Sequence, residues 1–97
     1  MNYKLILWQD AEKDLAQAYK WYNEKVPGLG FDFLAVVERV LESIQDNPLR
    51  FPVMYRKVRR ALVSRFPFGI FFVTEEERVV VLAVMHTARD PAKWRHP

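Results

Sequence analysis

The side chains best suited to chemistry gather in the part of the chain that follows Arg56. Guanidinium groups bind phosphates and carboxylates through paired hydrogen bonds, and imidazole exchanges protons near neutral pH. This region could therefore bind anions and transfer protons, and its candidate residues are Arg59, Arg60, Arg65, His86, Arg89 and His96.

Several of these candidates, and the neighbouring residues Asp90 and Trp94, also have a purely structural explanation. His86 ends an apolar run and fits a hydrogen-bonded histidine of the fold as well as a base. Arg89 and Asp90 can pair and cap a last helical turn. Trp94 can close the open end of the core instead of stacking on a partner.

Arg59 and Arg60 are neighbours, so on a strand they point to opposite faces and cannot both line one site. We expect one of them to lie beside a helix, with its stem packed and its charged end paired to an acid such as Glu38 or Glu42.

Neither a metal nor a cofactor is expected. Cysteine is absent, and the two histidines lie ten residues apart with only Asp90 between them as a further ligand. Three glycines are too few for a phosphate-binding loop, and Ser43 and Ser64 stand in no nucleophile motif.

Charge divides the chain into two unlike parts. Residues 1–47 carry five Lys or Arg against eight Asp or Glu, and residues 48–97 carry ten against four. The basic part favours a nucleic acid or an acidic protein segment as partner, and a solvated basic face with no partner is the alternative.

The elements that position these residues follow from apolar periodicity. Alternating apolar side chains predict a strand over residues 3–8. Asp10 is the expected N-cap of a helix that ends before Pro27, with Asp14 in its first turn. The helix carries one apolar stripe, formed by Ala11, Leu15, Ala18, Tyr22 and Val26. A second helix is predicted over residues 31–46, and the Pro-Gly turn makes a helical hairpin.

A loop over residues 48–56 and three strands complete the prediction. The strands are expected over residues 57–65, 68–74 and 79–86, the last two as a hairpin. Asp90 and Pro91 predict a short C-terminal helical turn over residues 92–95. The order β-α-α-β-β-β indicates an α+β fold, with the helical hairpin packed on a small, mainly antiparallel sheet.

Length and hydropathy favour one domain over residues 1–97. The longest apolar run, residues 79–85, is far shorter than a membrane span. We therefore expect a cytoplasmic protein without membrane contact.

The order of elements and the segments VRRALVSRFPFGIFF and VVVLAVMHTARDPAKW resemble the RelE/ParE superfamily of type II toxins, often labelled plasmid stabilisation proteins. The helical part is similar too, at Ala11, Asp14, Leu15, Trp21, Tyr22, Gly30, Phe31, Phe33, Asn47 and Pro48.

The resemblance implies a growth-inhibiting toxin that forms a hetero-oligomer with a cognate antitoxin, whose flexible acidic segment wraps around it. An antitoxin that orders on binding uses apolar sites and arginines. The residues we expect to contact it are Trp21, Tyr22, Arg56 and Arg60.

The superfamily has two branches. ParE-like members act on DNA gyrase by protein contact, and RelE-like members cleave mRNA on the ribosome. Cleavage needs a base, phosphate donors and a proton source, but no tyrosine follows Tyr55 and few lysines are near. We therefore favour gyrase, contacted through Arg59, Arg60, Arg65, His86, Arg89 and Trp94. In the alternative endoribonuclease, Arg65, His86 and Arg89 would be catalytic.

Overall fold

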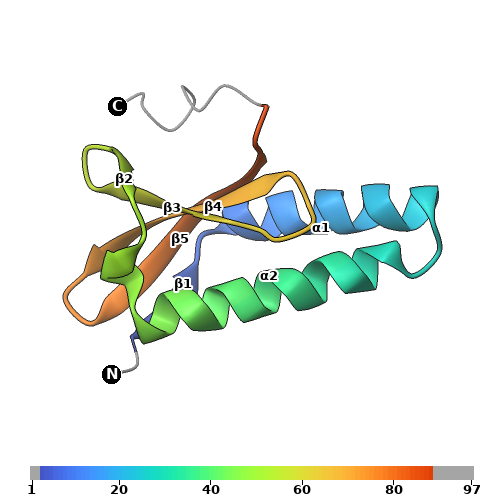
Figure 1. The fold of residues 1–97 in the computed structure, drawn as a ribbon. Coiled ribbons are helices and arrows are strands. Elements are labelled where there is room, and N and C mark those ends of the chain that lie inside the picture. Colours follow the sequence, from blue (N-terminus) through green and yellow to red (C-terminus); the bar gives the residue numbers. More distant parts are fainter. Residues whose placement is uncertain (1–2, 89–97) are drawn as a thin grey trace.

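A helical hairpin covers one face of a five-stranded sheet in the computed structural model, which describes residues 3–88 (Figure 1). This arrangement confirms the predicted α+β fold and the order of its main elements. The elements are β1 (Lys4–Leu7), α1 (Gln9–Lys25), α2 (Leu29–Asp46), the 3₁₀ turn η1 (Pro48–Arg50), β2 (Val53–Tyr55), β3 (Val58–Leu62), β4 (Phe68–Glu75) and β5 (Arg78–His86).

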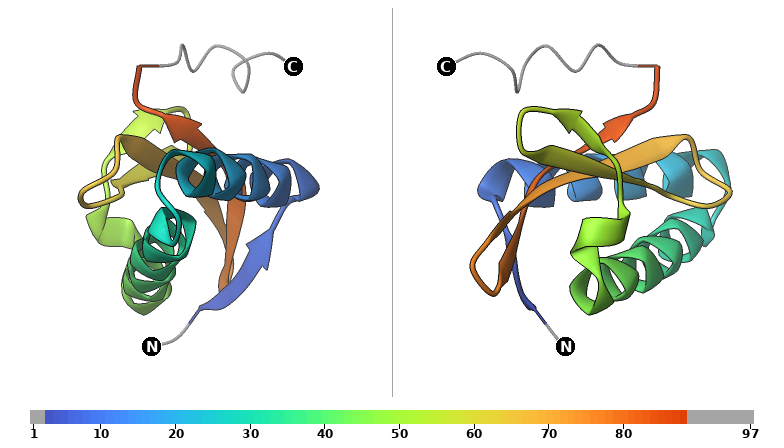
Figure 2. Two further views of the ribbon diagram at one scale, coloured as in Figure 1. Left: turned by 90° about the vertical axis from the view of Figure 1, so that its right-hand side faces the viewer. Right: turned by 60° about the vertical axis from the view of Figure 1, so that its left-hand side comes forward.

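The strands lie in the order β1-β5-β4-β3-β2, and only the β1–β5 pair is parallel. Between β1 and β5 the chain passes through both helices and strands β2, β3 and β4, a connection that is long enough for the crossover that a parallel pair needs. Figure 2 shows from two further sides that α1 and α2 lie together against the twisted sheet.

A bulge in β5 changes the direction of its side chains. Phe71 pairs with Ala83 and Phe72 pairs with Val81, so Leu82 is the extra residue between them. Because an extra residue shifts the two-residue alternation by one, Val84 joins Val81 in the core under the helices.

The main core lies between the helices and the sheet. Its largest fully buried side chains come from α2, β4 and β5, and each contributes about 1.5–3 kcal/mol of transfer free energy. They are Phe33, Ile44, Ile70, Phe72, Val79 and Val81. A smaller apolar cluster on the opposite face of the sheet contains Val58, Phe71, Ala83 and Met85.

The two helices approach each other closely at Gly30. A Cβ atom there would lie 2.5 Å from the backbone oxygen of Tyr19, and the Gly30 N–H donates to Asn23 Oδ1 at 2.8 Å. The turn before α2 needs glycine for a different reason, because Gly28 has a φ of +90°.

Some predicted details were wrong. Helix α1 begins at Gln9 after Trp8, which makes no side-chain capping bond, so Asp10 is not its N-cap. The predicted loop over residues 48–56 contains η1 and the edge strand β2. The sequence did not reveal β2, because three residues are too few to show the alternation of apolar and polar side chains that marks a strand.

Other boundaries moved as well. The strand predicted over residues 57–65 is limited to β3, since the following turn places Arg65 at a φ of +71°. Helix α2 begins two residues earlier than predicted. The predicted C-terminal turn lies outside the described residues. Within residues 3–88, no helix is long and apolar enough to cross a bilayer.

Candidate functional site

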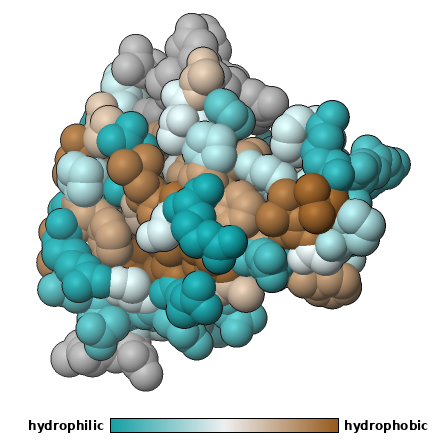
Figure 3. All heavy atoms as spheres, turned by 45° about the vertical axis from the view of Figure 1, so that its right-hand side comes forward, coloured by the Kyte–Doolittle hydropathy of each residue, from teal (hydrophilic) through white to brown (hydrophobic). Residues whose placement is uncertain are grey.

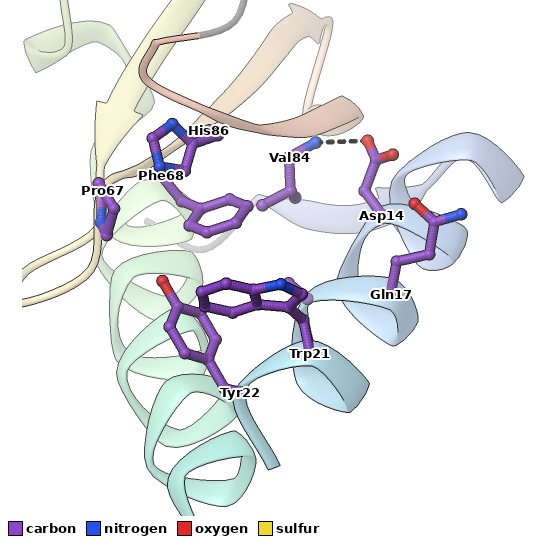
Figure 4. Close-up of a pocket in the computed structure, with 9 residues that line it drawn as sticks. Asp14, Gln17, Trp21, Tyr22, Pro67, Phe68, Val84 and His86 are labelled. Atoms are coloured by element: carbon purple, nitrogen blue, oxygen red, sulfur yellow. Dashed lines mark hydrogen bonds between the residues drawn. The ribbon is translucent and has the colours of Figure 1, made fainter. Parts of the chain in front are cut away.

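A groove of about 520 Å³ lies between α1 and the adjoining ends of β4 and β5 (Figure 4). We call it the aromatic groove, because four of its nine lining residues carry aromatic rings. It is lined by Asp14, Gln17, Ala18, Trp21, Tyr22, Pro67, Phe68, Val84 and His86.

Helical spacing brings Asp14, Ala18 and Trp21 to one face of α1, since residues four and three apart are neighbours on a helix surface. The opposite wall begins at Phe68 and ends at His86, which pair across β4 and β5. His86 faces the groove because the bulge at Leu82 has shifted the alternation of β5.

The floor of the groove is a packed aromatic cluster. The ring of Tyr22 lies 5.3 Å from Phe33, 5.0 Å from Phe66 and 6.1 Å from Phe68, measured between centroids. Burial raises the pKa of the Tyr22 hydroxyl, because desolvation disfavours the phenolate. Tyr22 therefore stays neutral near pH 7, with a hydroxyl that can donate or accept a hydrogen bond.

Trp21 forms the exposed wall. Its side chain is 53% exposed, its ring is 5.1 Å from that of Tyr22, and Lys25 Nζ lies 4.8 Å from its centroid. Figure 4 shows Trp21 and Phe68 on opposite sides of the groove. A large aromatic side chain beside a concave apolar floor is a typical anchor for a protein partner.

Asp14 fastens α1 to β5 at the end of the groove. Strand β1 pairs with β5 only as far as Val81, so beyond that point β5 lacks a strand partner on this side. Asp14 Oδ2 accepts the Val84 N–H at 2.9 Å and takes the place of a strand carbonyl. Asp14 is thus a positioning residue of the groove and does not belong to the first turn of α1, where we expected it.

His86 is exposed at the rim, with its ring 5.4 Å from that of Phe68. Its Nδ1 accepts the Ala88 N–H at 3.1 Å. In the neutral ring the proton therefore lies on Nε2, which can donate to a partner. This geometry suits a binding residue better than a general base.

The predicted site residues meet only in part. Trp21, Tyr22 and His86 come together in the aromatic groove, although we had assigned them to two different partners. Arg65 is exposed on the turn that leads to Pro67, with its guanidinium 5.5 Å from the Phe66 centroid.

Arg59 and Arg60 do point to opposite faces. On the helix side, Arg59 donates to the carbonyls of Leu49 at 3.2 Å and Phe51 at 2.7 Å. The expected ion pair to Glu38 or Glu42 is therefore wrong, because η1 brings backbone acceptors closer than those acids.

Arg60 lies on the opposite face of the sheet, away from the groove. Its stem crosses Gly69, where a Cβ atom would be 3.2 Å from the Arg60 Cγ and Cδ atoms. Within the described part of the chain, its buried Nε has no hydrogen-bond partner.

Arg56 belongs to the β2–β3 turn, with a φ of +53°, and donates from Nε to the Tyr55 hydroxyl at 3.0 Å. It is not part of the aromatic groove. Arg89 and Trp94 lie outside the described residues. Residues 3–88 contain no group of three His, Asp or Glu side chains that could hold a metal ion.

The sequence prediction missed most of the groove, namely Asp14, Gln17, Ala18, Pro67, Phe68 and Val84. The spacing of Asp14, Ala18 and Trp21 on one helix face is the signal that could have revealed part of it. Hydrophobic side chains reach the surface elsewhere too, between hydrophilic ones (Figure 3).

Known proteins are similar to this chain in sequence and in fold. A profile described as "ParE toxin of type II toxin-antitoxin system, parDE" matches residues 5–91. A protein named "Toxin ParE2" from two Mycobacterium tuberculosis strains is 24% identical over 92 residues, which are 94% of this chain and 88% of the relative.

A solved structure described as "Chromosomal ParDE TA system from P. aeruginosa" has a similar fold. Its TM-score is 0.78 at 18% identity, over 87% of this chain and 95% of the other. The profile match covers most of the sequence, and the chain therefore belongs to the ParE toxin family of type II toxin–antitoxin systems.

Proposed function

We propose that this ParE toxin is neutralised by a cognate antitoxin that inserts apolar side chains into the aromatic groove. The single observation that carries the proposal is the exposed Trp21 beside the buried Tyr22 and the half-buried Phe68. A partner that removes Trp21 and the exposed part of Phe68 from water gains binding free energy.

Polar groups at the rim would fix the orientation of the bound segment. The His86 Nε2–H and the Tyr22 hydroxyl can donate hydrogen bonds, and Lys25 and Arg65 offer positive charge nearby. An acidic segment that becomes ordered on binding would use such groups.

We further propose that the free toxin inhibits DNA gyrase by protein contact. Membership of the ParE family supports this target. The described residues also give little support to RNA cleavage, because His86 Nδ1 is occupied by the Ala88 N–H. Arg65 stands on a separate turn, over Phe66.

Induction of the chain alone, followed by parallel assays of plasmid supercoiling and mRNA integrity, tests the target. We expect growth arrest with loss of negative supercoiling and intact messages, and recovery when the antitoxin is co-expressed. Cleaved messages with normal supercoiling would contradict the gyrase proposal.

A further inference from the structure

The longest stretch of the chain without an acidic side chain covers residues 47–74. We call this stretch the basic segment. It carries six cationic side chains, which are Arg50, Arg56, Lys57, Arg59, Arg60 and Arg65. So long a stretch with charge of one sign indicates an anionic partner.

The fold gathers the basic segment at one edge of the sheet. The segment forms η1, β2, β3 and most of β4, and β2 is the edge strand. The Arg60 N–H donates to the Pro52 carbonyl at 3.1 Å, and the Arg59 guanidinium holds η1 beside β3 through the Leu49 carbonyl. Figure 1 shows β2 and the turn after it at the margin of the molecule. The charge of the segment is therefore concentrated along this edge.

This charge is not neutralised by acids. Within residues 3–88, the one ion pair at 4.0 Å or less joins Arg78 to Glu75, outside the basic segment. Arg59 is engaged with backbone carbonyls, and the Nε of Arg60 is buried. The other four cations of the segment are exposed, namely Arg50, Arg56, Lys57 and Arg65.

Aromatic rings hold two of the exposed guanidinium groups in place. Arg56 donates from Nε to the Tyr55 hydroxyl at 3.0 Å, and its guanidinium carbon lies 5.3 Å from the centroid of that ring. Arg50 lies 5.1 Å from the Phe51 centroid and donates from Nη2 to the Ser43 hydroxyl. Each of these hydrogen bonds uses one nitrogen of the guanidinium, so further N–H groups can serve a partner. A side chain that is already held loses less conformational entropy when it binds.

The exposed cations lie toward both ends of β3. Arg56 and Lys57 precede the strand, and Arg65 lies on the turn after it. The five residues of β3, at about 3.3 Å each, separate the two ends by roughly 17 Å. A DNA duplex carries one charge per about 1.7 Å of its axis, so it presents about ten phosphates over that length. A duplex of any sequence thus reaches both ends, whereas an acidic peptide needs carboxylates at matching positions.

We propose that the basic segment binds the sugar-phosphate backbone of duplex DNA without sequence preference. The four exposed cations contact phosphate oxygens, and β3 sets the spacing between them. This site goes beyond the proposed function and requires neither the antitoxin nor gyrase. A toxin bound to gyrase would use it to contact the duplex on which that enzyme acts.

Fluorescence anisotropy of a labelled duplex of about 20 base pairs tests the site, with the purified chain at salt concentrations from about 50 to about 200 mM. The test variant is the double substitution Arg56→Glu with Lys57→Glu. The matched control is Lys13→Glu with Lys20→Glu, which changes the net charge equally at exposed positions of α1. Circular dichroism melting curves confirm that each variant is folded. Arg65→Gln, on a separate turn, provides an independent measurement if the double variant does not fold.

We expect the logarithm of the association constant to fall linearly with the logarithm of the salt concentration. The slope should be about −3 to −4, because each of four phosphate contacts contributes about −0.9. The double variant should reduce the magnitude of the slope by about 2, and Arg65→Gln should reduce it by about 1. The control should keep the slope of the unmodified chain.

Equal slopes for the double variant, Arg65→Gln and the control would overturn the site. Tighter binding to a single-stranded RNA of the same length would overturn it too, as would displacement of the duplex by polyglutamate at equal charge concentration. Each of these two results would assign the basic segment to another class of partner. Because neither gyrase nor antitoxin is present, failure here leaves the proposed function standing.

Discussion

Single residues determine the shape of the aromatic groove, and Asp14 is the clearest case. Its carboxylate accepts the Val84 N–H and joins α1 to the end of β5. Hydrogen bonds to a charged group contribute about 1.5–3 kcal/mol.

Replacing Asp14 tests this role. We expect Asp14→Ala to lower the free energy of unfolding by about 1–3 kcal/mol, because the Val84 N–H loses its acceptor. Asp14→Asn should cost less, since its amide oxygen can still accept. Chemical denaturation measures the change, and the exposed Asp10→Ala is the control. Equal stability of Asp14→Ala and Asp10→Ala would contradict a positioning role.

Tyr22 gives a pH dependence with a definite sign. Burial raises its pKa above the ordinary value of 10.0, so above pH 10 the unfolded chain loses this proton before the folded chain does. The contribution of Tyr22 to the free energy of unfolding is therefore fully present below pH 10. It is lost as the pH rises through the pKa that Tyr22 has in the folded state.

Comparison with Tyr22→Phe isolates this effect from lysine titration. Between pH 8 and pH 11 the unmodified chain should lose more thermal stability than Tyr22→Phe does, as measured by melting temperature. An identical loss in both chains would show that Tyr22 does not titrate differently in the folded state.

At the scale of elements, the helical hairpin depends on close contact between α1 and α2. We expect Gly30→Ala to destabilise the fold by about 1–3 kcal/mol, because its Cβ would lie 2.5 Å from the Tyr19 carbonyl oxygen. Gly28→Asn is the control, because its side chain meets open space and asparagine tolerates positive φ. Thermal melts in which the control loses as much stability as Gly30→Ala would contradict a packing role for Gly30.

The sequence predicted the long elements because their apolar periods are clear. The stripe of α1 and the apolar runs of β4 and β5 need no tertiary information. Strand β2 was missed because it has only three residues and lies close to Pro52. Its pairing of Val53 with Arg59 crosses a short turn that contains no glycine, so the usual hairpin signal is absent.

The site was less predictable than the fold. Trp21, Tyr22 and His86 stood out individually in the sequence. His86 reaches the side of the sheet that carries Trp21 and Tyr22 because of the bulge at Leu82, and the sequence has no turn or glycine signal for that bulge. Arg59 was misassigned because its acceptors are the backbone carbonyls of Leu49 in η1 and of Phe51, which follows η1. Side-chain types alone cannot indicate such partners.

At the scale of the whole molecule, the aromatic groove lies in a chain with a net charge of +3. An acidic partner is attracted to such a chain, and it gains further affinity when it covers the groove. It would also hide Trp21, Phe68 and His86 from any other protein, which offers a direct route to neutralisation.

The most direct test of the account is the supercoiling of relaxed plasmid by purified DNA gyrase in the presence of the purified toxin. We predict that the toxin inhibits supercoiling in proportion to its concentration, and that an equimolar amount of antitoxin restores it. The Trp21→Ala toxin should need about tenfold more antitoxin for the same recovery. Full supercoiling at a large excess of folded toxin would contradict the central claim.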